Sequence, residues 1–231
     1  RKTSEAIIYI EVDHHSDEQL MADLAQEIEE VLREVQRCVR DFPEMLEKAK
    51  KTAQELRDAC TVNDKEACTE AAEFVDWMAS NHFTFLAYDE FTVSDAKSGK
   101  VVDRDPTHDL GIFRNIDTTR SRVQLKELEP EIREFITGPS LINFMKSGNR
   151  SRIHRPAYPD YVVVKRFDKH GNVIGGMRFM GLFTSIVYIE TPNNIPIIRR
   201  KLTAIREKAG FERASHSAKE LDRILEVYPR D

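Results

Sequence analysis

The stretch that decides the fold is YVVVKRFDKHGNVIGGMRFMGLFTSIVYI, which runs from Tyr161 to Ile189. Its two halves, 161–167 and 173–189, are rich in β-branched and aromatic residues, which favour strands. The segment between them, DKHGN at 168–172, is polar and contains a glycine, as is typical of a hairpin loop. The stretch therefore predicts a hairpin within an antiparallel sheet.

The sequence upstream of this hairpin predicts a helical arm. Ser16 is a suitable N-cap, and the apolar residues that follow recur at steps of three or four. We expect Pro43 to end or kink this helix, because proline lacks the backbone N–H that an interior position needs. A weaker helix is predicted to residue 59, and a third helix over about 64–80. The apolar stripe of the first helix consists of Leu20, Leu24, Ile28, Val31, Val35, Val39 and Phe42.

The remaining elements complete an α+β pattern. Further helices are predicted over 130–135, 140–145 and 196–210, and from 215 onward. Further strands are predicted over 6–12, 82–93, 110–113 and 122–125. The sequence thus predicts a helical arm followed by an antiparallel β-sheet flanked by helices.

Composition limits the classes of function. Of the 231 residues, 40% are hydrophobic and 32% are charged, which is ordinary for a folded domain. The net charge of −5 does not favour general attraction to nucleic acids or anionic membranes. No apolar run approaches the roughly 20 residues that a membrane span needs. Cys38, Cys60 and Cys68 have no spacing typical of zinc ligands, so we expect free thiols in a reducing compartment.

Both ends of the sequence look cut, because it begins at Arg1 without an initiator methionine and ends without a tail. We therefore expect an internal piece of a longer, cytoplasmic protein.

The sequence contains no convincing catalytic set. GNVIGG at 171–176 lacks the G-x-G-x-x-G order and lies in a hairpin, so it does not indicate a dinucleotide loop. His14 and His15 form a lone histidine pair next to a predicted helix start, and such a pair lies on the surface more often than it binds a metal. We therefore assign no catalytic, cofactor-binding or metal-binding residue.

One cluster of cations is a candidate for binding an anion. Arg150, Arg152 and His154 alternate along the sequence, so a strand would place them on one face. Such a face could hold an anionic metabolite. The alternative is a solvated or interdomain edge that pairs with acidic residues elsewhere.

Several blocks along the chain carry a resemblance to known proteins. They are EFVDWM (73–78), NHFTFLAY (81–88), LGI (110–112), SRIHRP (151–156), DY (160–161), VKRFD (164–168), RFMGLFTS (178–185), IPIIRRK (195–201) and ILEVYPRD (224–231). In these blocks, which span nearly the whole chain, the sequence resembles the large bacterial NAD-specific glutamate dehydrogenases.

The resemblance implies a parent enzyme that oxidatively deaminates L-glutamate to 2-oxoglutarate and ammonium with NAD. It implies that the catalytic and NAD-binding residues lie further along the parent polypeptide. It also implies that 1–15 contain the last strand of a truncated ACT-like domain and 16–64 a helical arm. Residues 65–210 would form a PAS-like domain, and 211–231 a helix leading to the next domain.

Two functions of this piece follow from the resemblance. It is either a structural module that packs against other domains and subunits of a homo-oligomer, or a sensor that binds an amino-acid or anionic effector. In the sensor, Arg152 and His154 would add an anion contact. A third alternative is nucleic-acid binding through 146–155. The wall of the effector cavity would be Phe83, Phe85, Tyr161, Val163, Phe179 and Phe183.

Overall fold

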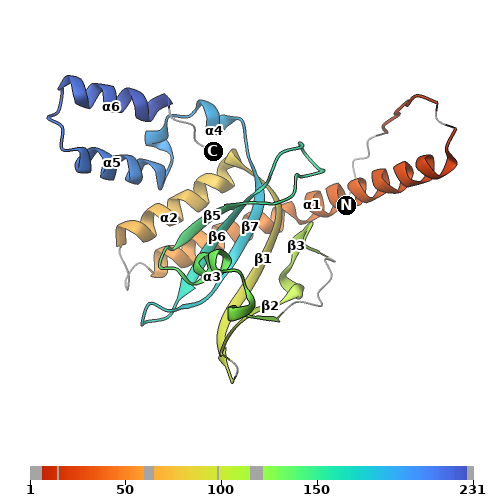
Figure 1. Ribbon diagram of the computed structural model, residues 1–231, viewed down its shortest axis with the longest axis horizontal. Coiled ribbons are helices and arrows are strands. Elements are labelled where there is room, and N and C mark those ends of the chain that lie inside the picture. The colour runs from red at the N-terminus through yellow and green to blue at the C-terminus, as the bar shows by residue number, and fades with distance from the viewer. Residues whose placement is uncertain (1–6, 15, 60–64, 98, 115–121, 228–231) are drawn as a thin grey trace.

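The computed structural model describes residues 7–14, 16–59, 65–97, 99–114 and 122–227. Its α-helices are α1 (Glu18–Ala59), α2 (Lys65–Trp77), α3 (Pro130–Thr137), α4 (Ile186–Ile189), α5 (Ile198–Ala209) and α6 (His216–Val227). Its strands are β1 (Phe83–Ala96), β2 (Gly99–Arg104), β3 (Leu110–Gly111), β4 (Arg122–Gln124), β5 (Ile142–Lys146), β6 (Asp160–Phe167) and β7 (Val173–Phe183). This α+β architecture confirms the predicted fold class (Figure 1).

The strands form one open antiparallel sheet in the order β4-β2-β1-β7-β6-β5, with β3 paired to β1. The hairpin predicted from 161–189 is β6 and β7. Asp168 closes its loop, because its Oδ1 accepts hydrogen bonds from the backbone N–H groups of His170 (2.8 Å) and Asn172 (2.9 Å). Gly171 has a φ of 82°, which glycine adopts at little cost.

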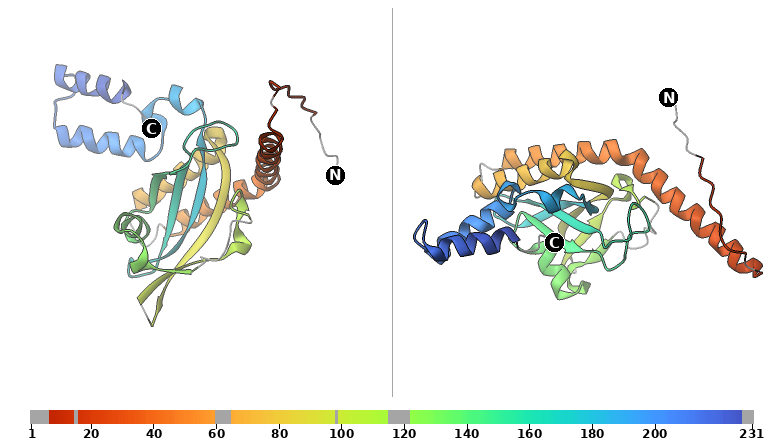
Figure 2. Two further views of the ribbon diagram at one scale, coloured as in Figure 1. Left: turned by 45° about the vertical axis from the view of Figure 1, so that its right-hand side comes forward. Right: turned by 90° about the horizontal axis from the view of Figure 1, so that it is seen from above.

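The main core lies between the sheet and helices α1 and α2. Tyr88 on β1 and Val162 on β6 are both paired with Phe179 on β7, so all three side chains project from the same face. Each is at most 1% exposed, and the rings of Tyr88 and Phe179 are 5.0 Å apart. Met45 of α1 and Val75 of α2 complete this core, and Figure 2 shows the two helices lying across one face of the sheet.

A second, smaller core lies on the opposite face, where α1 passes the end of the sheet. It contains Cys38, whose Sγ donates a hydrogen bond to the backbone oxygen of Leu86 at 3.1 Å. The turn after β3 fits tightly here, because a Cβ on Gly111 would lie 2.0 Å from that same oxygen. The carboxylate of Asp41 accepts a hydrogen bond from the N–H of Gly111 at 2.9 Å and so ties α1 to β3.

The first predicted helix extends much further than expected, because α1 continues through Pro43 to Ala59. Of the two predicted effects of Pro43, the end of the helix is therefore excluded, and the kink remains a prediction. Contacts on both sides of the proline hold the helix in place. Before it, the carboxylate of Asp41 accepts a hydrogen bond from Nε of Arg114 at 2.6 Å, and after it, Met45 is fully buried. Tertiary packing of this kind outweighs the one backbone hydrogen bond that proline removes.

Three other predicted elements differ from the structure. The segment 140–145, predicted as a helix, contains strand β5, in which alternate residues Ile142 and Phe144 face the main core. The strand predicted to reach Ile189 ends at Phe183 and is followed by α4. The strand predicted over 6–12 is not present in its described part, because residues 7–14 are exposed and no strand of the described residues pairs with them.

Cys38 and Cys68 are free and buried, as predicted, whereas Cys60 and His15 lie outside the described residues. Among the described helices, none is both long and apolar enough to cross a membrane. The domain boundaries at 15, 64 and 210 remain predictions.

Candidate functional site

The predicted cation cluster lies in a loop, not on a strand, because residues 147–159 connect β5 to β6 without regular structure. The alternation expected of Arg150, Arg152 and His154 is therefore not present. The guanidinium of Arg152 forms an ion pair with Glu34 and lies 3.6 Å from Glu30, both on α1. The loop thus uses this arginine to fasten itself to the helix.

The other two cations of the cluster are exposed. The guanidinium carbon of Arg150 lies 5.3 Å from the ring centroid of Tyr158, a cation–π distance. His154 has a φ of 65° and follows Ile153, which is buried in the smaller core. Arg150 and Arg152 thus contact different groups, Tyr158 in the one case and α1 in the other.

Tyr161 and Phe179, the other predicted contact residues, lie on opposite faces of the sheet. Tyr161 is paired with Met180 and projects with it toward the smaller core, where its ring stacks on Phe113 at 6.4 Å. Phe179 is fully buried in the main core. The structure thus does not bring the five predicted residues into one cavity, and their role in binding an effector or a partner remains a prediction.

The wall predicted for an effector cavity is also divided. Helices α1 and α2 cover Phe83, Phe85 and Phe179 in the main core. The ring of Phe85 lies 5.2 Å from that of Phe83 and 5.7 Å from that of Phe179. Val163 is buried on the other face. Phe183 of this set lines an open pocket.

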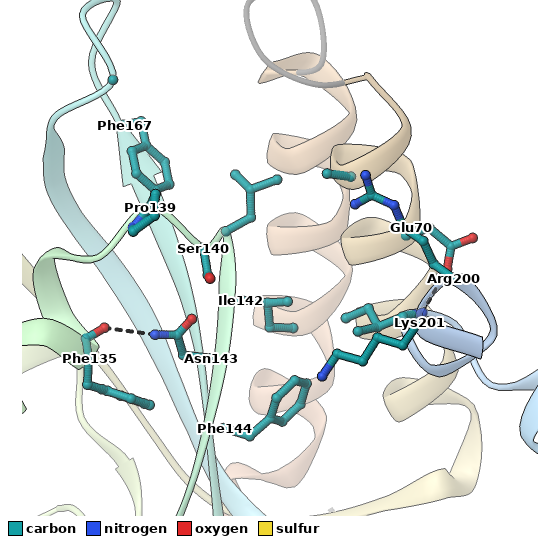
Figure 3. Close-up of a pocket in the computed structure, with 14 residues that line it drawn as sticks. Glu70, Phe135, Pro139, Ser140, Ile142, Asn143, Phe144, Phe167, Arg200 and Lys201 are labelled. Atoms are coloured by element: carbon teal, nitrogen blue, oxygen red, sulfur yellow. Dashed lines mark hydrogen bonds between the residues drawn. The ribbon is translucent and has the colours of Figure 1, made fainter. Parts of the chain in front are cut away.

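Two adjoining pockets lie along the β5 edge of the sheet. The first, which we call the edge pocket, has a volume of about 870 Å³ and lies between α2, α5 and β5 (Figure 3). Asn143 on its floor donates a hydrogen bond to the backbone oxygen of Phe135 at 3.0 Å. Glu70 on its wall accepts a hydrogen bond from the N–H of Ile197 at 2.7 Å. Asn143 and Glu70 therefore already have partners within the fold.

The second, which we call the aromatic pocket, has a volume of about 710 Å³ and opens between α2, α4, α5 and the ends of β5–β7. Phe74 lines it, 5.2 Å from the ring of Phe144 and 5.4 Å from that of Trp77. Phe183 lies 6.0 Å from Trp77 and completes the aromatic wall. This volume is within the range of about 300–1,000 Å³ that is typical of small-molecule sites.

The rim of the aromatic pocket is basic. Lys146 is paired with Asp160 at 2.9 Å, but Arg155 and Lys201 have no acidic partner within the described residues. Arg155 donates through Nη2 to the backbone oxygen of Phe183 at 2.8 Å. Both unpaired cations are exposed, whereas the floor beneath them is apolar and buried. An apolar floor beneath basic side chains suits an amphipathic anion.

A charged network elsewhere on the sheet has structural partners only. Glu90 accepts hydrogen bonds from Lys48 at 2.9 Å, Tyr88 at 2.7 Å and Arg166 at 3.1 Å. Burial alone would raise the pKa of Glu90, but the hydrogen bonds from its three partners have the larger combined effect and lower the pKa to about 2. On the opposite face, Asp89 is buried beside Arg178 in an ion pair. These groups stabilise the strands and have little freedom to bind a ligand.

Lys165 is a buried titratable side chain of the sheet. It is 2% exposed, and its Nζ donates to the backbone oxygen of Gly138 at 2.7 Å. Burial lowers the pKa of this lysine to about 8. Within the described residues no acidic side chain forms an ion pair with it. Nor do His, Cys, Asp and Glu residues of the described chain form a cluster of three that could hold a metal ion.

Reasoning from the sequence missed the aromatic pocket, because its members come from segments that are distant along the chain. The signal that could have located it is the single tryptophan, Trp77, near the edge of an apolar helix face. The phenylalanines of β5 and β7 could have been added only once the strand order was known.

Comparison with known proteins relates the chain to one family of enzymes. Residues 195–231 match the family model "Glutamate dehydrogenase, helical motif 1". The chain is 42% identical over 229 residues to an NAD-specific glutamate dehydrogenase of Halomonas elongata, and 39% identical over 229 residues to one of Pseudomonas aeruginosa. These alignments cover 98% and 99% of the chain but 14% of each relative. They confirm the resemblance that the sequence blocks indicated.

Proposed function

We propose that this chain is a segment of a large NAD-specific glutamate dehydrogenase, because the matches to two such enzymes cover nearly its whole length. In this proposal the complete polypeptide converts L-glutamate, NAD and water to 2-oxoglutarate, ammonium and NADH. The segment supplies contacts between subunits, and the chemistry takes place elsewhere. Because the chain spans 14% of its relatives, the rest of such a polypeptide has room for a separate catalytic domain.

The observation that carries the contact role is the unpaired apolar surface of the N-terminal half of α1. This half, Glu18–Arg37, extends beyond the sheet (Figure 2), and we call it the arm. Leu20, Ile28 and Leu32 on the arm are 46%, 41% and 49% exposed. Large apolar side chains in a row on one helix are costly in water and are typical of a surface that another element covers.

The unpaired surface lies on a different side of α1 from the one that packs on the sheet. With 3.6 residues per turn, Leu32, Val35 and Val39 point about a quarter turn away from Cys38 and Met45. The last two are buried, whereas Val39 is 69% exposed. The body of the protein therefore leaves this surface free to pack against a partner.

The charge distribution favours a second copy of the chain as this partner. Residues 18–30 contain five acidic and no basic side chains, whereas 31–40 contain three arginines and one glutamate. An antiparallel pair of arms would place the acidic end of each beside the basic end of the other. A parallel pair would instead place like charges together. We therefore expect two arms to pack antiparallel along their apolar stripes.

Sedimentation equilibrium of the chain tests this proposal. We expect reversible self-association that weakens as salt is raised, because the charges of the arm are exposed. The double variant Leu32→Glu/Val35→Glu should raise the dissociation constant by about 100-fold or more, since each buried aliphatic side chain contributes about 1.5–3 kcal/mol.

The matched control is Ala22→Glu/Gln26→Glu, which adds the same charge to exposed positions on the polar side of the arm. It should weaken association far less. A wild-type chain that stays monomeric at every concentration, or a control that dissociates as readily as the test variant, would contradict the proposal.

We also propose that residues 65–210 form a PAS-like domain of the parent enzyme. The support is an antiparallel sheet whose central strands are β1 and β7, with helices packed on one face. A solved structure of the complete relative would test the boundaries, and a sheet completed by strands from another domain would contradict them.

A further inference from the structure

We propose that the aromatic pocket is a binding site for a small organic carboxylate that has an apolar body and no ammonium group. The proposal goes beyond the contact role and does not depend on the arm. It rests on three features of the pocket: its aromatic wall, its two unpaired cations and the strained backbone between them and the sheet.

The wall fits the body of such a ligand. Phe74, Val187 and Ile195, all members of the main core, line its floor and are at most 7% exposed, and the indole of Trp77 lines the pocket with them. The indole is held in place, because Nε1 donates to Glu190 at 3.0 Å and the ring stacks on His82 at 4.4 Å. A fixed aromatic surface of this kind binds an aliphatic or aromatic group without first having to be ordered.

The first turn of α5 explains why the ligand should be an anion. It carries Arg199, Arg200 and Lys201 and no acidic residue, although cations are unfavourable at the positive end of a helix. Arg199 is compensated by ion pairs with Glu70 and Glu73 of α2.

Lys201 has no comparable partner within the described residues, and it lines the aromatic pocket together with Arg155. A carboxylate between these two cations would offset the unfavourable charge. An ammonium group on the ligand would add a third positive charge to this rim, because Asp160 is already paired with Lys146 at 2.9 Å.

The residue that leads into α5 is strained. Ile197 has φ 67° and ψ −47°, a conformation that a β-branched side chain rarely adopts. Glu70 holds it there through the hydrogen bond to its N–H at 2.7 Å. Ile197 lines the pocket just ahead of Lys201, so the strained turn fixes where the lysine enters the site.

Fluorescence provides a direct test, because Trp77 is the only tryptophan of the chain. We expect its emission to change saturably on titration with 3-phenylpropanoate. Acetate, which lacks the apolar body, and 3-phenylpropan-1-ol, which lacks the charge, should give no saturation over the same range. L-phenylalanine should bind more weakly than 3-phenylpropanoate.

The variants Lys201→Met and Arg155→Met should each weaken the binding of 3-phenylpropanoate by about fivefold or more. Lys208→Met, on the last turn of the same helix and outside the pocket, should leave it unchanged. Circular dichroism of each variant checks that the fold is retained. Absence of saturable binding to the wild type would overturn the proposal. So would equal binding of the alcohol, tighter binding of L-phenylalanine, or affinities unaffected by the two pocket variants.

Discussion

At the scale of single residues, the charge of Glu90 contributes to stability. Its pKa of about 2 lies below the ordinary value of 4.5, so its ionised form stabilises the folded state. That contribution is present at neutral pH and is lost as the pH falls from about 5 to about 2.

The substitution Glu90→Gln should therefore lower the free energy of unfolding at pH 7 by about 2–3 kcal/mol. The difference from the wild type should shrink toward zero as the pH approaches 2. Urea unfolding at several pH values measures this. Glu47→Gln is the control, because Glu47 is exposed and pairs only with Lys50 on its own helix. A difference that does not depend on pH would show that Glu90 acts through packing instead.

The charge of Lys165, unlike that of Glu90, lowers the stability of the folded protein at neutral pH. Burial lowers its pKa from 10.5 to about 8, so the unfolded chain binds its proton more tightly than the folded protein does. Charged Lys165 therefore costs stability below pH 8, and the cost disappears as the pH rises from about 8 to 10.5.

Relative to the Lys165→Met variant, the wild type should gain about 2 kcal/mol of stability between pH 8 and 10. The comparison removes the effects of other groups that titrate in this range. The unpaired backbone oxygen of Gly138 adds an offset that does not vary with pH. Lys169→Met, in the exposed hairpin loop, should follow the wild type at every pH. Parallel curves for Lys165→Met and the wild type would contradict the prediction.

At the scale of elements, Asp41 joins α1 to β3. It is 3% exposed, and its carboxylate accepts hydrogen bonds from Arg40, Gly111 and Arg114. Asp41→Ala should destabilise the protein by about 2–4 kcal/mol, because the N–H of Gly111 would be left buried without an acceptor. Thermal unfolding compares it with Asp58→Ala, an exposed position near the end of the same helix. Equal effects of the two substitutions would mean that the joint contributes little.

The elements that sequence predicted well are those whose signal is local. The hairpin of β6 and β7 depends on a polar loop and two β-rich runs, and all three lie within 161–189. Strand β5 was predicted as a helix because its five residues are too few to distinguish the two periods. Its side chains settle as a strand because β6 offers hydrogen bonds along its free edge. The tendency of Pro43 to end the helix is likewise outweighed by contacts with residues that are distant along the chain.

The candidate site was less predictable than the fold. The predicted contact residues were chosen for their type and spacing, but Tyr161 and Phe179 differ by an even number of positions on two separate strands. Their faces depend on the register between β6 and β7, and that register pairs Tyr161 with Met180. Position on a face therefore follows from strand pairing, which a single sequence does not specify.

At the scale of the whole molecule, stability should vary along α1. Residues 18–30 contact little of the body, whereas Met45, Ala49 and Ala53 are fully buried. An isolated helix of that length is marginal in water. In dilute solution, we expect backbone amides of the arm to exchange hydrogen at least about 100-fold faster than those of the buried half.

Hydrogen exchange read by mass spectrometry checks this gradient. If arms pair as proposed, protection of the arm should rise with protein concentration while that of the buried half stays constant. Uniform slow exchange along the whole helix in dilute solution would contradict both the gradient and the marginal stability of the arm.

The burial of Cys38 makes its thiol a reporter of how often α1 separates from the sheet. Its thiol is hydrogen-bonded to the backbone beneath α1, and burial raises its pKa to about 11, so little reactive thiolate is available while the helix is seated. A thiol reagent can reach the sulfur only in the moments when α1 lifts from the strand. The rate at which this sulfur is modified would therefore measure how often α1 opens locally. Comparing that rate at low and high protein concentration would show whether pairing of the arm stabilises the contact between α1 and the sheet.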